Sequence, residues 1–137
     1  MPSRNDPVRV AEIMTRRVRT AEPDQRLSEI WQMLVDERCH HIPIVDDGRP
    51  VGMVSTRDLI RVARKHGARK ISEGLYGQET ASDIMSTDLQ TIDVAESVET
   101  AIERIGLGDI HALVVLDDEG LLTGIVTNHD LLDYLIS

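Results

Sequence analysis

The chain has 137 residues, an apolar content of 41% and a formal net charge of −9. This length allows a core without disulfides, and the single cysteine, Cys39, excludes an internal disulfide. No apolar run reaches the roughly 18 residues of a membrane helix, and the start, MPSRNDPVRV, lacks a secretory pattern. We therefore expect a soluble protein of the reducing cytoplasm, without a membrane partner.

The charge is divided unevenly along the chain. Residues 1–70 carry 14 Lys and Arg against 10 Asp and Glu, whereas residues 71–137 carry one, Arg104, against 14. This division argues against a nucleic-acid surface along the whole chain and makes the first half the better host for a phosphate. Only one Trp and two Tyr are present, so base stacking has little support.

The first strong pattern in chain order is an amphipathic helix, which the sequence repeats. EIMT at 12–15 precedes an apolar face at Leu27, Ile30, Trp31 and Leu34, with the i, i+3, i+4, i+7 spacing of a helix. At an offset of 71 residues, DIMS precedes the same face at Val98, Ala101, Ile102 and Ile105. Trp31 is predicted to lie in the core or at a dimer interface.

A β-hairpin follows each helix. HHIPIVDD at 40–47 and PVGMVS at 50–55 read as two strands joined by a turn, and HALVVLDD at 111–118 and LTGIVT at 122–127 read in the same way. The second turn contains one extra residue. The glycine in each second strand would allow a ligand or a neighbouring backbone to come close.

A closing helix begins at a motif that also occurs twice. GMVSTRDLI at 52–60 and GIVTNHDLL at 124–132 share Gly, a hydroxyl and Asp at fixed spacing. The hydroxyl and the acid have the spacing of a capping box, which needs no ligand. The same residues offer a carboxylate and free backbone N–H groups to a ribose and an anion, so both interpretations stay open.

The pattern predicts two repeats, at 8–66 and 81–137, joined by a linker at 67–80. Each repeat reads as a short extended segment, a helix, two strands and a helix, and we expect the two repeats to pack together. The first closing helix is expected over about 56–66, with basic residues in its last turn and Gly67 as its C-cap.

These residues resemble the tandem cystathionine-beta-synthase (CBS) domain pair, or Bateman module. The resemblance rests on EIMT and DIMS, on Thr20 and Thr91, on HHIPIVDDGRPVGMVSTRDLI, and on the second copy of that segment. It implies an α/β (α+β) fold of two pseudo-two-fold-related repeats. It also implies a non-catalytic sensor without a required cofactor, which binds AMP, ADP, ATP, S-adenosylmethionine or a similar adenosyl ligand. A homodimer and an effector protein are the implied partners.

The resemblance also assigns site residues. It places Asp58 and Asp130 on ribose hydroxyls, and Ser55 and Thr127 at ribose or phosphate. By its position in the first helical turn beside Asp58, Arg57 is either a phosphate ligand or a surface arginine, and His129 takes its place in the second repeat. Thr20-Ala21 and Thr91-Ile92 would flank the base. Ile42-Pro43-Ile44 would form the apolar wall for one adenine, and Leu113-Val114-Val115 that for the other. Val114 replaces the usual proline, which weakens the second site.

Other functions find less support. Cys39, His40 and His41 alternate faces along a strand and do not form a metal site without a turn. No nucleophile with a base and an orienting partner stands out, so we expect no enzyme. A ligand-free scaffold is the alternative, and a regulator that binds nucleic acid through the basic first half is weaker. A solvated helix end is favoured over phosphate contact for the basic cluster Arg61, Arg64, Lys65, Arg69 and Lys70. The opposite charges of the two halves favour an antiparallel dimer.

Overall fold

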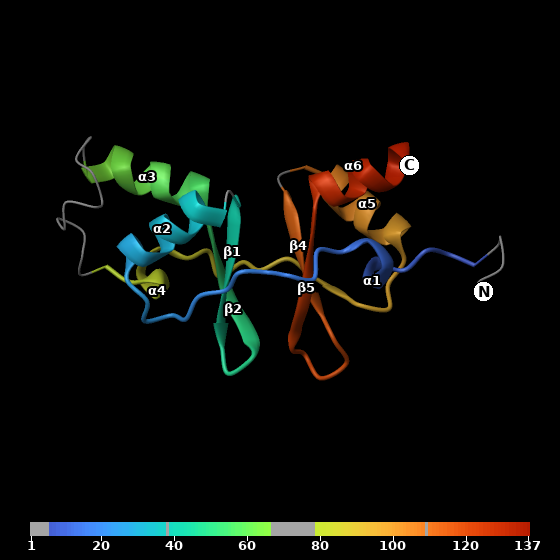
Figure 1. Ribbon diagram of the computed structural model, residues 1–137, viewed down its shortest axis with the longest axis horizontal. Coiled ribbons are helices and arrows are strands. Elements are labelled where there is room, and N and C mark those ends of the chain that lie inside the picture. The colour runs from blue at the N-terminus through green and yellow to red at the C-terminus, as the bar shows by residue number, and fades with distance from the viewer. Residues whose placement is uncertain (1–5, 38, 67–78, 109) are drawn as a thin grey trace. The chain divides into compact units, whose positions relative to one another are not determined.

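The computed structural model describes residues 6–37, 39–66, 79–108 and 110–137, which form six helices and two sheets (Figure 1). The chain divides into two compact units. One, here called the N-repeat unit, comprises residues 19–89. The other, the C-repeat unit, comprises residues 1–18 and 90–137. The predicted mixed α/β fold is confirmed.

The N-repeat unit is a hairpin covered by helices. Strands β1 (His41–Asp46) and β2 (Arg49–Ser55) pair antiparallel, and helices α2 (Leu27–Glu37), α3 (Thr56–His66) and α4 (Ala81–Ile84) complete the unit. Asp47 and Gly48 turn the hairpin with φ values of 54° and 81°, the left-handed pair that a tight two-residue turn requires. The predicted helical face is confirmed, because Leu27, Ile30 and Leu34 are buried against the hairpin.

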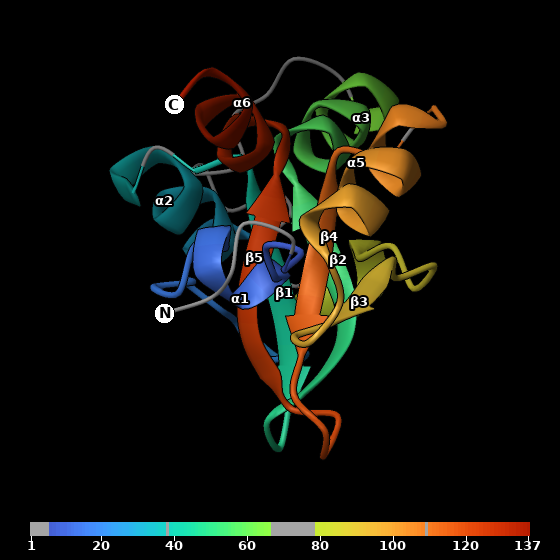
Figure 2. The same cartoon turned by 90° about the vertical axis from the view of Figure 1, so that its right-hand side faces the viewer.

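The C-repeat unit repeats this plan with an additional strand. Its elements are α1 (Val10–Ile13), β3 (Thr91–Asp93), α5 (Val98–Gly106), β4 (Ala112–Leu116), β5 (Leu122–Thr127) and α6 (Asn128–Ile136). Figure 2 shows β3 beside β4, where it pairs parallel, and β5 pairs antiparallel on the other side of β4. The turn after Asp117 is one residue longer than that after Asp46, as predicted, with Gly120 at φ 81°.

The opening segment of each repeat belongs to the unit that contains the body of the other repeat. In the N-repeat unit the backbone N–H of Leu27 donates to Glu79, and that of Ala81 donates to Gln25, at 2.9 and 2.8 Å. In the C-repeat unit the pairs at an offset of 71 are Val98 to Val8 and Val10 to Glu96, both at 2.8 Å. The two repeats thus exchange their openings reciprocally.

This exchange explains the repeated glycines. A Cβ built on Gly124 would lie 2.6 Å from Met14 Sδ and 2.9 Å from the Thr15 carbonyl oxygen. On Gly52, a Cβ would meet Met85 and would lie 3.0 Å from the Ser86 carbonyl oxygen. Both methionines come from the EIMT and DIMS openings. The glycines therefore make room for a neighbouring segment of the chain.

Trp31 is 40% exposed, because the helix turns only Leu27, Ile30 and Leu34 fully inward. Of the two positions expected for Trp31, the core is therefore wrong, and the dimer interface stays a prediction. At the end of the predicted linker, the Glu79 carbonyl oxygen accepts a hydrogen bond from the Leu27 N–H, and Thr80 is the N-cap of α4. The remainder, 67–78, lies outside the described residues, and so do the predicted cap Gly67 and the basic residues Arg69 and Lys70.

In the described part of the chain, α2 and α3 are the longest helices, and no helix has the length and apolarity needed to cross a bilayer.

Candidate functional site

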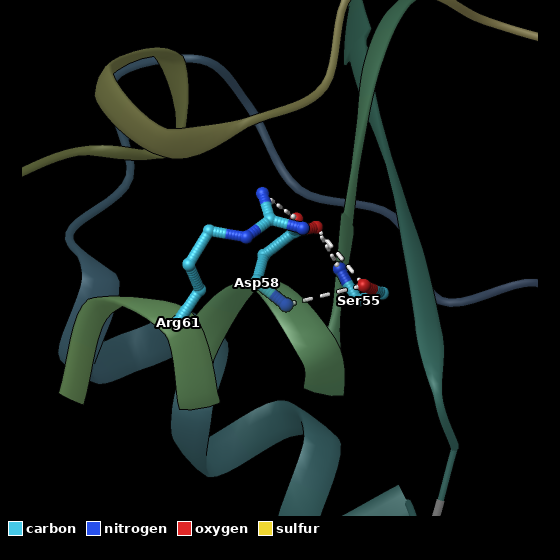
Figure 3. Close-up of polar contacts among 3 residues, drawn as sticks. All are labelled: Ser55, Asp58 and Arg61. Carbon is cyan, nitrogen blue, oxygen red and sulfur yellow. Dashed lines mark hydrogen bonds and ion pairs between the residues drawn. The ribbon is translucent and has the colours of Figure 1, made fainter. Parts of the chain in front are cut away.

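The N-repeat motif forms a complete capping box at the start of α3 (Figure 3). Asp58 Oδ2 accepts a hydrogen bond from the Ser55 backbone N–H at 2.8 Å and another from the Ser55 hydroxyl at 3.0 Å. The Asp58 backbone N–H donates in return to Ser55 Oγ at 3.3 Å. The helix begins here because these bonds satisfy backbone groups that the first turn leaves without partners.

The second carboxylate oxygen of Asp58 is held less firmly. Arg61, one helical turn further on, places Nη1 3.4 Å from Oδ1, longer than the 2.7–2.9 Å or so that is typical of a charged hydrogen bond. The Asp58 side chain is only 10% exposed, whereas that of Arg61 is 70% exposed (Figure 3). Asp58 therefore presents one oxygen fixed to its own helix and one with a loose cationic partner.

The predicted base-binding segments of this repeat do come together. Ala21 pairs parallel with Ile44, its N–H donates to the Pro43 carbonyl oxygen at 3.1 Å, and its own carbonyl oxygen accepts from the Val45 N–H at 2.8 Å. Ile42 and Ile44 are fully buried in the core of the unit, and Pro43 is also buried. Thr20 and Arg57 are exposed, and Ser55 is half-buried.

The C-repeat motif has the same capping box but a different outer contact. Asp130 Oδ2 accepts from the Thr127 N–H at 2.9 Å and from the Thr127 hydroxyl at 3.2 Å. Asp130 Oδ1 accepts a hydrogen bond from the Thr15 hydroxyl at 2.9 Å. A ribose hydroxyl would have to displace Thr15 from this oxygen. His129, beside the box, is exposed.

The wall residues of the C-repeat unit lie inside its sheet. Leu113 and Val114 are fully buried, and Ile92 is 4% exposed. Thr91 pairs with Val114 across the parallel ladder, and the Val114 N–H donates to the Gln90 carbonyl oxygen at 2.9 Å. Pro43 occupies the equivalent position in the first repeat and has no N–H to donate. The first repeat accordingly has a single bridge where the second has a short strand.

One contact of each motif aspartate is not predicted from the sequence, that of Arg61 with Asp58 and that of Thr15 with Asp130. In the sequence Arg61 is grouped with the basic residues at the helix end, although its i, i+3 spacing from Asp58 is a local signal for a pair. Thr15 lies 115 residues from Asp130 along the chain, and no local pattern connects them. Its position follows only from the exchange of the repeat openings.

A separate cavity of about 400 Å³ lies in the C-repeat unit. Asp93, Glu96, Asp117 and Asp118 line it together with Arg104. Arg104 donates to the Thr91 carbonyl oxygen and, at 3.2 Å, to Gln90 Oε1, and Asp117 Oδ1 accepts two backbone N–H groups of its turn. Arg104 thus holds the edge strand, and Asp117 holds the turn.

In the Cys39-His40-His41 segment, the pKa of Cys39 departs from its ordinary value. Burial raises the pKa of the Cys39 thiol, and the backbone hydrogen bond and nearby Arg19 only partly oppose this shift. The described residues include no group of three or more His, Cys, Asp or Glu side chains placed to hold a metal ion.

Sequence comparison agrees with the repeats and the fold. A family model described as the CBS domain matches residues 10–65 and again 81–137. The chain belongs to the CBS domain family. It is 30% identical over 122 residues to the CBS domain-containing protein YhcV of Bacillus subtilis, covering 89% of this chain and 81% of YhcV. It is 28% identical over 129 residues to a Methanocaldococcus jannaschii protein, covering 91% of this chain but only 46% of that protein.

Solved structures of CBS pairs have the same fold. The CBS domain pair of protein MJ0100, in complex with 5′-methylthioadenosine and S-adenosyl-L-methionine, gives a TM-score of 0.80 at 23% identity, covering 95% of this chain and 97% of that one. CBSX2 of Arabidopsis thaliana, in complex with AMP, also gives 0.80 at 23% identity, covering 94% and 96%. At this identity the likeness concerns the fold.

Proposed function

We propose that this chain is a regulatory module that binds an adenosine-containing ligand at the Ser55–Asp58 site of the N-repeat unit, without catalysing a reaction. The observation that carries the proposal is the Asp58 carboxylate, almost buried at the first turn of α3, with one oxygen fixed by the capping box and the other only loosely paired. CBS pairs of the same fold are found in complex with AMP and with S-adenosylmethionine, which supports this class of ligand.

The chemistry of the site suits a ribose. A carboxylate accepts hydrogen bonds from two vicinal hydroxyls, and such charge-assisted bonds are stronger than neutral ones. Asp58 Oδ1 needs only to release the distant Arg61 guanidinium to accept a hydroxyl. The backbone pairing of Ala21 with Ile44 places the Thr20-Ala21 segment beside the Pro43 strand, where the adenine would bind.

Regulation would follow from population shift. A ligand changes the balance between two arrangements of the chain only if it binds one of them more tightly. In this proposal the module is a cytoplasmic homodimer, and the ligand changes the relative orientation of the repeats or of the two copies. An effector protein then responds to that change.

A thermal-shift screen with AMP, ADP, ATP, S-adenosylmethionine and NAD tests the proposal. A ligand at 100 times its dissociation constant adds about 2.7 kcal/mol of apparent stability. We expect at least one of these compounds to raise the midpoint, and Asp58→Asn to remove most of the shift while the ligand-free protein unfolds nearly normally. Asp130→Asn is the matched control, since the Thr15 hydroxyl already occupies the second oxygen of Asp130.

A ligand-free scaffold is the competing function, and one observation favours it. Both capping boxes are complete without a ligand, and the apolar residues Val35 and Ile60 are 53% and 68% exposed. If none of the five compounds shifts the midpoint, the adenosyl proposal fails and the scaffold becomes the better account.

A further inference from the structure

The two closing helices carry opposite charges at the same place. Arg61 follows Asp58 by three residues on α3, and Asp133 follows Asp130 by three residues on α6. Both side chains are exposed one turn beyond the motif carboxylate. Charges at this spacing lie on the same face of a helix and act on the same ligand. A cation therefore accompanies one candidate site and an anion the other.

We propose that Arg61 makes the N-repeat site selective for adenosyl ligands with an anionic 5′ tail, such as a phosphate, and that Asp133 and Thr15 make the C-repeat site reject them. This inference rests on the proposed function and specifies its ligand class. It assigns Arg61 as a specificity-determining residue.

The geometry of Arg61 suits an exchange of partners. Its Nη1 lies 3.4 Å from Asp58 Oδ1, and its side chain is 70% exposed, so little free energy holds it in place. When a ribose hydroxyl takes Oδ1, the guanidinium is freed and turns to the phosphate, which it binds bidentately. Arg57, exposed in the first turn of α3, adds a second positive charge near the helix N-terminus.

The C-repeat site has the opposite properties. Thr15 donates to Asp130 Oδ1 at 2.9 Å, a shorter bond than that of Arg61 to Asp58. No Lys or Arg occurs in α6, and Asp130 and Asp133 place two carboxylates one turn apart. A phosphate bound here would face both negative charges, which disfavours it. A ligand without a phosphate is the only adenosyl class that this surface tolerates.

Calorimetric titration of the whole chain with AMP and with adenosine tests the proposal, because the two probes differ only in the phosphate. We expect AMP to bind about tenfold more tightly than adenosine, the ratio that one hydrogen bond between charged groups provides. In Arg61→Gln this ratio should fall severalfold, because the phosphate loses its guanidinium contact while Arg57 remains. Adenosine affinity should not fall, because adenosine has no phosphate and Arg61 no longer competes for Asp58 Oδ1. Added salt should reduce the ratio in the wild type.

Arg64→Gln is the matched control, because it removes the same charge from the same helix one turn further from Asp58. It should keep most of the preference for AMP. Equal affinities for AMP and adenosine in the wild type, or equal effects of the two substitutions, would overturn the inference but leave the proposed function intact. If neither compound binds, the proposed function fails and this inference fails with it. Arg61 is exposed, so unfolding of the variant should match the wild type and serves as the folding check.

Discussion

The two units differ most at a position where one carries proline and the other valine. Val114 donates its N–H to Gln90, and β3 forms a parallel ladder of three residue pairs along β4. Pro43 has no N–H, and Ala21 makes a single bridge to Ile44. One missing donor thus loosens the segment that would contact the base in the N-repeat unit. Pro43, the residue expected to favour ligand binding, therefore also weakens the local sheet.

The net charges of the two units differ less than the net charges of the two halves of the sequence. Along the chain the halves carry +4 and −13, but the N-repeat unit contains 10 Lys and Arg against 12 Asp and Glu, and the C-repeat unit 5 against 12. Because the openings are exchanged, Arg9, Arg16 and Arg17 of the first repeat lie in the unit that contains the acidic second repeat. Both units are therefore net negative, and the electrostatic preference for an antiparallel dimer is smaller than the sequence halves predict.

Substituting proline at the valine position should have the largest effect. Val114→Pro removes the hydrogen bond to Gln90 within a central strand and places the proline ring against the neighbouring backbone, and we expect a loss of about 3 kcal/mol of unfolding free energy. Urea denaturation followed by circular dichroism measures it. The reverse change, Pro43→Val, should alter stability by less than about 1 kcal/mol, because a new hydrogen bond offsets the added freedom of the unfolded chain. Equal losses for the two would contradict the comparison.

The repeated glycines should show the next largest effect. Gly124→Ala brings a methyl group against Met14 and the Thr15 carbonyl oxygen, and we expect a loss of about 2 kcal/mol. Gly52→Ala should cost less, because Met85 is only half-buried and has more room to move than Met14, which is 8% exposed. Thermal unfolding of both variants gives the comparison.

Gly106→Ala is the control for these substitutions. Nothing lies within 4 Å of a Cβ at this helix end, so the change should be neutral or stabilising by up to about 1 kcal/mol. A loss at Gly106 as large as that at Gly124 would mean that close approach to the opening segment is not the reason for the motif glycine.

Local patterns in the sequence predicted the elements but not the exchange of openings. The helical face of Leu27, Ile30 and Leu34 and the two capping boxes are confirmed because they depend on residues three or four positions apart. The Thr15 to Asp130 bond depends on the EIMT segment packing on the other repeat, which no local periodicity encodes. Local periodicity also does not encode the difference between the β3–β4 ladder of one unit and the single Ala21–Ile44 bridge of the other. That difference depends on whether a backbone N–H is present and not on side-chain hydrophobicity.

Removing the capping hydroxyls should have a smaller effect that still separates the units. Ser55→Ala deprives the nearly buried Asp58 carboxylate of one donor and its backbone N–H of an acceptor, and we expect a loss of about 1 kcal/mol. Thr127→Ala should cost about half as much, because Asp130 is less buried and keeps the Thr15 hydroxyl. Chemical denaturation resolves the difference, and an equal or larger loss at Thr127 would show that Thr15 does not support its carboxylate.

The smallest expected effect is a pH dependence of stability that arises from Cys39. This residue lies in the N-repeat unit and is the only cysteine of the chain. Burial raises the pKa of its thiol, so the folded chain keeps the proton at a pH where the unfolded chain has begun to lose it. Stability from this group is complete below the unfolded thiol pKa of about 8.5 and is lost as the pH rises through the higher folded pKa. We expect the unfolding free energy measured by urea denaturation to fall by less than about 1 kcal/mol between about pH 8 and 10. Cys39→Ala should lower stability at both values through lost packing but should flatten this part of the pH dependence. An unchanged slope in the variant would assign the loss to other groups.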